Sequence, residues 1–89
     1  MRAILTVLGK DRRGIIAGVS SLLAEYDVNI LDISQTILQE YFTMILLADL
    51  TACPLSLAQM QDKLTSLGVE LGLEIRLQHE DIFNSMHRI

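Results

Sequence analysis

The sequence predicts an α+β fold in which a four-stranded antiparallel sheet carries two helices on one face. Three observations predict it. Four segments are short apolar runs or alternate between apolar and polar residues, and in two others apolar residues recur at helical spacing. The segments follow the order strand, helix, strand, strand, helix, strand, with a short helical segment at the end. The 89 residues fit one small domain, with a core of about 3–78 and a helical extension over 80–88.

The first half of the chain predicts a strand, a helix and a second strand. Residues 3–8 are an apolar run that ends at Gly9, which is typical of a strand buried on both faces. An apolar stripe over 14–27 indicates an amphipathic helix, for which Asp11 is a candidate N-cap or pre-cap residue. Strict alternation over 28–38 predicts a strand with one buried face and one polar face.

The second half predicts a strand, a helix and a last strand. Residues 41–51 are apolar on both faces near their middle, which favours a central strand. Ser56 and Gln59 form a capping-box pattern for a helix that continues to Leu71. Alternation over 73–77 predicts a half-buried strand. The final segment, 80–88, predicts a short helix with the following apolar residues on one side: Ile82, Phe83, Met86 and Ile89.

This order is that of the ferredoxin-like βαββαβ sandwich, in which the first and third strands are central. The arrangement leaves Ile4, Leu8, Ile45 and Leu47 on the face away from the two main helices. A second subunit or the last helix would cover them. The second strand, at the edge, and the first helix are the expected contact of a homodimer or a higher homo-oligomer.

Composition excludes several classes of function. Seven basic and eleven acidic residues give a net charge of −4, which argues against a nucleic-acid or anionic-membrane binder. The single Cys53 allows no intrachain disulfide, and no apolar run approaches the ~20 residues that span a bilayer, so we expect a cytoplasmic protein. Neither His79 nor His87 has the converging ligands of a metal site, and no cofactor is implied.

The loop between the first strand and the first helix is the candidate binding site. Backbone N–H groups at a helix start suit an anion, and Gly14 allows a ligand to approach the backbone. Asp11 could accept from an ammonium group, and Asn29 could both donate and accept, so the set complements a zwitterion. The alternative is that Asp11 only caps the helix, while Arg12 and Arg13 are solvated.

Two runs carry a family resemblance: Asp11-Arg12-Arg13-Gly14-Ile15-Ile16 and Val28-Asn29-Ile30. Together they resemble the signature of ACT domains, small ferredoxin-like regulatory modules that bind amino acids, usually between two subunits. The resemblance covers about residues 3–78. The stretches 32–36, 40–44 and 81–83 are similar to the stand-alone UPF0237 group, which is related to ACT proteins of the glycine-cleavage-regulator type.

The resemblance implies a ligand site made by Asp11, Arg12, Arg13, Gly14, Ile15, Asn29 and Ile30. In the family, the residues that match Asp11 and Asn29 contact the amino group or carboxylate of the ligand, and Ile15 and Ile30 would wall the site. This chain departs from the pattern at Arg13, where the family often has Pro, and at Asp11, where Asn or His is usual.

The expected function is therefore regulatory and not enzymatic: a cytoplasmic oligomer that binds a small amino acid and modulates a separate, unidentified protein. The alternative is a homodimeric interaction module without a ligand. Acylphosphatases share the topology, but this loop lacks their Gly-rich cradle and Asn29 lies in the wrong place. RNA-binding domains of this topology need mid-sheet aromatics and a basic surface, and this chain has a net charge of −4.

Overall fold

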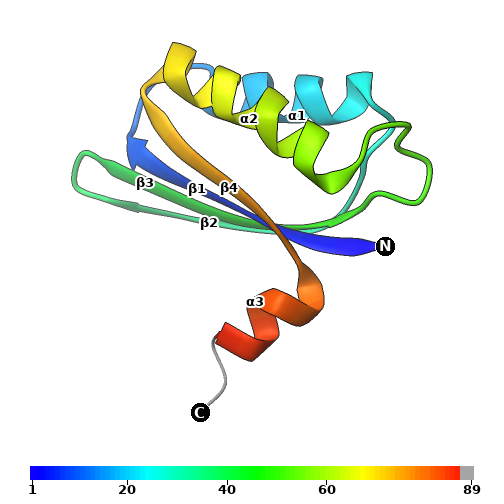
Figure 1. Ribbon diagram of the computed structural model, residues 1–89. Helices are drawn as coiled ribbons and strands as arrows, with labels where there is room; N and C mark the ends of the chain where they lie inside the picture. The colour runs from blue at the N-terminus through cyan, green and yellow to red at the C-terminus, as the bar shows by residue number, and fades with distance from the viewer. Residues whose placement is uncertain (87–89) are drawn as a thin grey trace.

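The computed structural model describes residues 1–86, so the last two positions of the expected helix, 87 and 88, and the expected placement of Ile89 lie outside the described residues. The elements are β1 (Arg2–Lys10), α1 (Ile15–Glu25), β2 (Asn29–Leu38), β3 (Tyr41–Asp49), α2 (Leu57–Leu71), β4 (Leu73–His79) and α3 (Glu80–Met86). The strands form one antiparallel sheet in the order β2-β3-β1-β4. Helices α1 and α2 cover one face, while α3 lies beneath the other (Figure 1). The predicted ferredoxin-like α+β sandwich is confirmed.

The core lies between the sheet and the two long helices. Alternate residues of β1 and β3 supply its floor, and every one of the following is at most 3% exposed: Ala3, Leu5, Val7, Phe42, Met44, Leu46 and Ala48. Met60 and Leu64 of α2 are fully buried above them. The opposite side chains of the central strands face away from these helices, as the topology predicted, and Leu8 remains 47% exposed. The prediction that the first strand is buried on both faces is therefore wrong.

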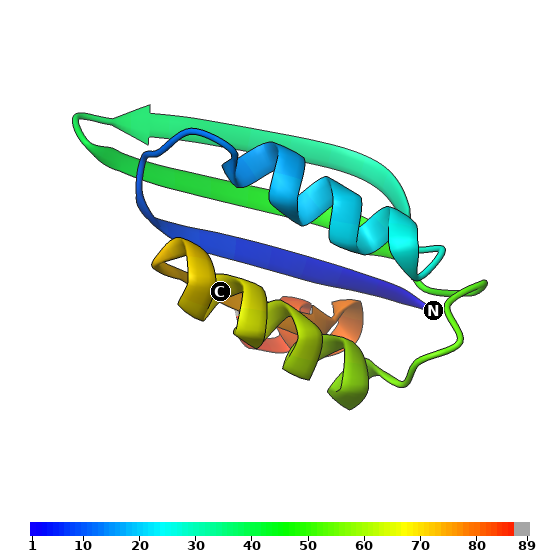
Figure 2. The same cartoon turned by 90° about the horizontal axis from the view of Figure 1, so that it is seen from above.

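Strand β2 departs most from its prediction. All ten of its residues are exposed, although the alternation predicted one buried face. The physical reason is its place in the sheet. It is an edge strand, and seen from above, α1 runs over the interior of the sheet while β2 lies outside both helices (Figure 2).

The ends of α1 and α2 differ in how they form. Helix α2 begins with the predicted capping box, in which Ser56 and Gln59 exchange hydrogen bonds of 2.9 and 3.1 Å. Helix α1 begins one residue later than predicted, because Gly14 is its N-cap and has a left-handed φ of 91°. No side chain of the described residues caps this helix, so the prediction of Asp11 as N-cap is wrong. The helix ends at Glu25 because Asp27 has a positive φ of 57°.

Helix α3 packs on the open face of the sheet, at one end. Its first residue, Glu80, forms an ion pair with Arg2 of β1, with 2.8 Å between the carboxylate oxygen and the guanidinium nitrogen. Phe83 points toward the sheet, whereas Ile82 is 55% exposed, so these two residues do not share one side as expected. Within residues 1–86, no helix combines the length and apolar character needed to cross a membrane.

Candidate functional site

The loop between β1 and α1 leads into the start of helix α1, where backbone N–H donors have no partner within the helix. The first helical hydrogen bond runs from the N–H of Gly18 to the carbonyl of Gly14, at 2.8 Å. The N–H groups of Ile15, Ile16 and Ala17 precede it, so they lack carbonyl partners within the helix. Because the helix dipole is positive at this end, the position favours an anion.

Two contacts hold the loop in place. The backbone N–H of Asp11 donates to the carbonyl of Glu40 at the β2–β3 turn, at 2.6 Å. The Arg12 guanidinium donates to the carbonyl of Leu71 at the end of α2, at 3.2 Å, where the negative end of that helix favours a cation. Among the described residues, the side chains of Asp11 and Arg13 make no hydrogen bond or ion pair. The Asp11 carboxylate is therefore available to a ligand.

A cavity of about 240 Å³ opens between this loop and the end of β2. It is lined by Asp11, Arg12, Gly14, Ile15, Ile16, Ala17, Gln35, Ile37 and Phe42. Four predicted site residues therefore meet here. The sequence interpretation did not include Gln35, Ile37 and Phe42. Their pairing across the β2–β3 hairpin, Gln35 with Met44 and Ile37 with Phe42, is what places them beside the loop.

The remaining predicted residues lie elsewhere in the same chain. Asn29 pairs with Asp49, and Ile30 pairs with Ala48, at the far end of β2. Nine residue steps along a strand correspond to roughly 30 Å, so one chain does not bring Asn29 to the loop. Arg13 belongs to the loop but does not line the cavity.

The far end of β2 has its own electrostatic feature. The Asp49 carboxylate accepts hydrogen bonds from the Thr51 hydroxyl at 2.6 Å and from the Thr51 backbone N–H at 2.9 Å. The N-terminal ammonium lies 3.7 Å away. The hydrogen bonds, and then the ammonium, lower the pKa of Asp49, so Asn29 neighbours a carboxylate that stays charged.

Of the two histidines considered as metal ligands, His79 lies in the described residues, and there it is not part of a metal site. Within residues 1–86, no three His, Cys, Asp or Glu side chains gather to hold a metal ion. The Nδ1 atom of His79 accepts from the N–H of Asp81 at 3.1 Å, a local contact at the start of α3.

A ferredoxin-like sandwich with a cavity beside its first loop is a class of small domain that serves many functions. The ACT domain profile matches residues 2–78, and the chain belongs to this family. Members of the family are regulatory and bind amino acids, which indicates a regulatory domain rather than a catalytic one.

Relatives agree with this membership. A UPF0237 protein of Clostridium acetobutylicum is 58% identical over 89 residues, the whole of both chains. An ACT domain protein from Streptococcus pneumoniae has a TM-score of 0.82 and 42% identity, covering 93% of each chain. A structure described as a candidate glycine cleavage system transcriptional repressor has a TM-score of 0.72 at 23% identity. It covers 86% of this chain and 44% of that one, and it shows the shared fold.

Proposed function

We propose that this chain is a regulatory ACT protein that binds an amino acid or a similar small zwitterion at a homodimer interface and modulates a separate protein. The observation that carries the proposal is strand β2, a sheet edge whose ten residues are all exposed. The proposal treats residues 1–89 as one ACT domain, with α3 as an extension, and places it in the cytoplasm.

The exposed edge is apolar as well as unpaired. Its large hydrophobic side chains and their exposed fractions are Ile30 (37%), Leu31 (44%), Ile33 (44%), Ile37 (56%) and Leu38 (70%). A long exposed apolar edge is a template for pairing with another chain. Antiparallel pairing of two copies through β2 would satisfy the backbone of the edge and bring these side chains against those of the second copy.

The same pairing reunites the two halves of the predicted site. When two copies of β2 pair antiparallel over their full length, Asn29 of one lies opposite Leu38 of the other. Leu38 pairs with Tyr41, which also pairs with Lys10 at the end of β1. In the same register Ile30 of one protomer lies opposite Ile37 of the other, which lines the loop cavity, so Asn29 and Ile30 come to the β2 edge of that cavity.

The resulting site has complementary chemistry for a zwitterion. A carboxylate would accept from the N–H groups of Ile15, Ile16 and Ala17 at the start of α1. The ammonium group would lie against the Asp11 carboxylate and the Asn29 amide oxygen. Arg12 fixes the loop through Leu71.

One observation favours the second candidate, a homodimeric interaction module without a ligand. The loop cavity of one chain is about 240 Å³, below the ~300 Å³ at which ligand pockets typically begin. The exposed β2 edge supports dimerisation in either case.

A thermal-unfolding screen against the twenty amino acids at millimolar concentration tests the proposal. A ligand at 100 times its Kd adds about 2.7 kcal/mol to the stability of the native state. In a domain of this size, each kcal/mol shifts Tm by roughly 4–8 °C. A selective shift supports the ligand site. A dimer that responds to no amino acid supports the interaction module.

Gly14→Val is the variant that locates the ligand. Gly14 has a φ of 91°, which a β-branched residue adopts only with strain, and it lines the cavity. We expect the variant to lose the amino-acid response and to remain a dimer, because Gly14 lies outside β2. Calorimetric titration with the amino acid identified in the screen measures the loss. Retained affinity would place the ligand elsewhere.

A further inference from the structure

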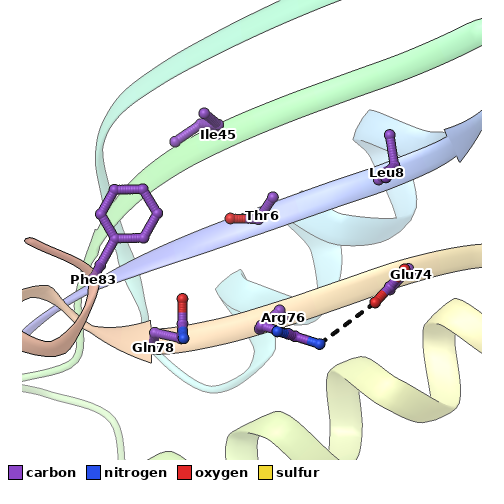
Figure 3. Close-up of a pocket in the computed structure, with 7 residues that line it drawn as sticks. All are labelled: Thr6, Leu8, Ile45, Glu74, Arg76, Gln78 and Phe83. Atoms are coloured by element: carbon purple, nitrogen blue, oxygen red, sulfur yellow. Dashed lines mark ion pairs between the residues drawn. The ribbon is translucent and has the colours of Figure 1, made fainter. Parts of the chain in front are cut away.

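A second and larger cavity lies on the opposite face of the sheet, beside α3. Its volume is about 400 Å³. Its lining comes from β1, β3, β4 and α3: Thr6, Leu8, Ile45, Glu74, Arg76, Gln78 and Phe83. Figure 3 shows these side chains projecting from one face of the three strands, with Phe83 reaching toward them from the helix. Nothing in the regulatory proposal above uses this cavity.

The strand register fixes the floor of this cavity. Thr6 pairs with Ile45 on one side and with Arg76 on the other, so the three side chains form a row across β3, β1 and β4. Neighbouring strands are about 4.8 Å apart, so the row spans about 10 Å from its apolar end to its charged end.

The two ends of the row differ in chemistry. On the β3 side, Ile45 and Phe83 provide apolar surface, and Ile45 is 43% exposed. Leu8 of β1 adds apolar surface next to Glu74 and is 47% exposed. On the β4 side, Arg76 and Glu74 present one positive and one negative group. A ligand that matches both ends needs a flat apolar body and one charged group.

Arg76 is the group best placed to bind that charge. Its ion pair with Glu74 has an N–O distance of 3.5 Å, and the two side chains are 60% and 69% exposed. A strong charge-assisted hydrogen bond is about 2.7–2.9 Å long, so this pair is loose, and solvent screens it. The guanidinium carries five N–H donors in a planar fork that matches a carboxylate.

We propose that this cavity is a second ligand site, and that its ligand is a small aromatic carboxylate. The ring packs on Phe83 and Ile45, and the carboxylate binds Arg76. A volume of about 400 Å³ falls within the range of about 300–1,000 Å³ found for small-molecule pockets. The site spans β3, β1 and β4 on the open face, and none of its lining residues belongs to β2, so pairing of two β2 strands edge to edge leaves it accessible.

The test is an NMR titration of the full chain with 3-phenylpropionate and with its neutral isostere, 3-phenylpropionamide. The backbone amides of Thr6, Ile45 and Arg76 report this cavity, and those of Ile16 and Ala17 report the β1–α1 loop. We expect saturable shifts at the first set. The carboxylate should bind about tenfold more tightly than the amide, since hydrogen bonds to charged groups are the stronger ones.

Three variants test whether Arg76 is the group that binds the carboxylate of the ligand. Arg76→Gln should bind the carboxylate and the amide equally, whereas Glu74→Gln should bind the carboxylate more tightly, because it removes a competitor for Arg76. Lys63→Gln is the control, because Lys63 is an exposed cation on α2 that lines neither this cavity nor the loop cavity, and the variant should titrate as the wild type does. These positions are exposed, so the variants should keep the fold.

Four results would overturn the proposal. The first two are amide shifts confined to the β1–α1 loop, and equal affinity of the wild type for the acid and the amide. The third is an Arg76→Gln variant that still binds the acid more tightly than the amide. The fourth is amide signals of the open face that move with protein concentration alone. The last result would mean that a second copy of the chain covers the face.

Discussion

Replacing Ile33 at the middle of β2 tests whether this edge is the dimer contact. Ile33 is 44% exposed in one chain. Full burial of an isoleucine side chain contributes about 1.5–3 kcal/mol, so burying the exposed part contributes about 0.7–1.3 kcal/mol in each copy. Two-fold symmetry doubles this to about 1.4–2.6 kcal/mol in the dimer, a factor of about 10–80 in Kd. Ile33→Glu should weaken the dimer by at least this factor, since it also introduces two like charges near the two-fold axis.

The measurement is sedimentation equilibrium over a range of protein concentrations, which gives the monomer–dimer Kd directly. Val69→Glu is the matched control, because Val69 is an apolar residue that is 81% exposed on α2, away from the edge. The same charge is therefore introduced at both positions. If Ile33→Glu dissociates no more readily than Val69→Glu, β2 is not the interface.

Two further predictions concern stability. Gly68→Ala should destabilise the fold by about 1–3 kcal/mol in urea unfolding, because a Cβ at this position would lie 2.6 Å from the backbone oxygen of Leu73; an unchanged midpoint would contradict the packing. The lowered pKa of Asp49 means that its charged form stabilises the fold above its ordinary pKa, and this contribution is lost as pH falls through the lowered pKa. Asp49→Asn should therefore flatten the acid end of the stability–pH curve, and an identical curve would contradict the prediction.

Most of the fold could be predicted because local signals agreed with one another. The capping box at Ser56 and the left-handed Gly72 bound α2 as expected. Gly18, inside α1, would place a Cβ 3.2 Å from a methyl group of Leu71, which explains a small residue where the two helices pack. These features depend on neighbours in sequence or on one helix face, which a periodic pattern reports.

The burial of β2 could not be predicted in the same way. Alternation identifies which residues share a face, such as Ile33 and Ile37, but it does not say whether anything covers that face. Coverage depends on the position of the strand in the sheet and on the width of two helices. A strand that looks half-buried in sequence can therefore be an interface that one chain leaves open.

Only the loop half of the candidate site was brought together as predicted, because the position of a strand in the sheet also decides which residues meet. The signature places Gly14 and Asn29 in one motif, and the chain connects them through a single helix. Strand direction then separates them, because β2 starts at the opposite end of the sheet from the β1–α1 loop. Gln35 and Ile37 line the cavity through hairpin pairing, for which the sequence carries no local signal.

The split site makes ligand binding and dimerisation one linked equilibrium under the proposed function. A ligand that contacts Asp11 of one protomer and Asn29 of the other binds only the dimer, so it must tighten the dimer by the same factor by which dimerisation tightens ligand binding. An interaction module without a ligand has no such coupling, and its Kd is the same with and without any amino acid. Measuring the dimer Kd with and without the amino acid found in the thermal screen therefore separates the two functions. A ligand that shifts Tm and leaves the dimer Kd unchanged would bind within one chain, and the role of Asn29 would be wrong.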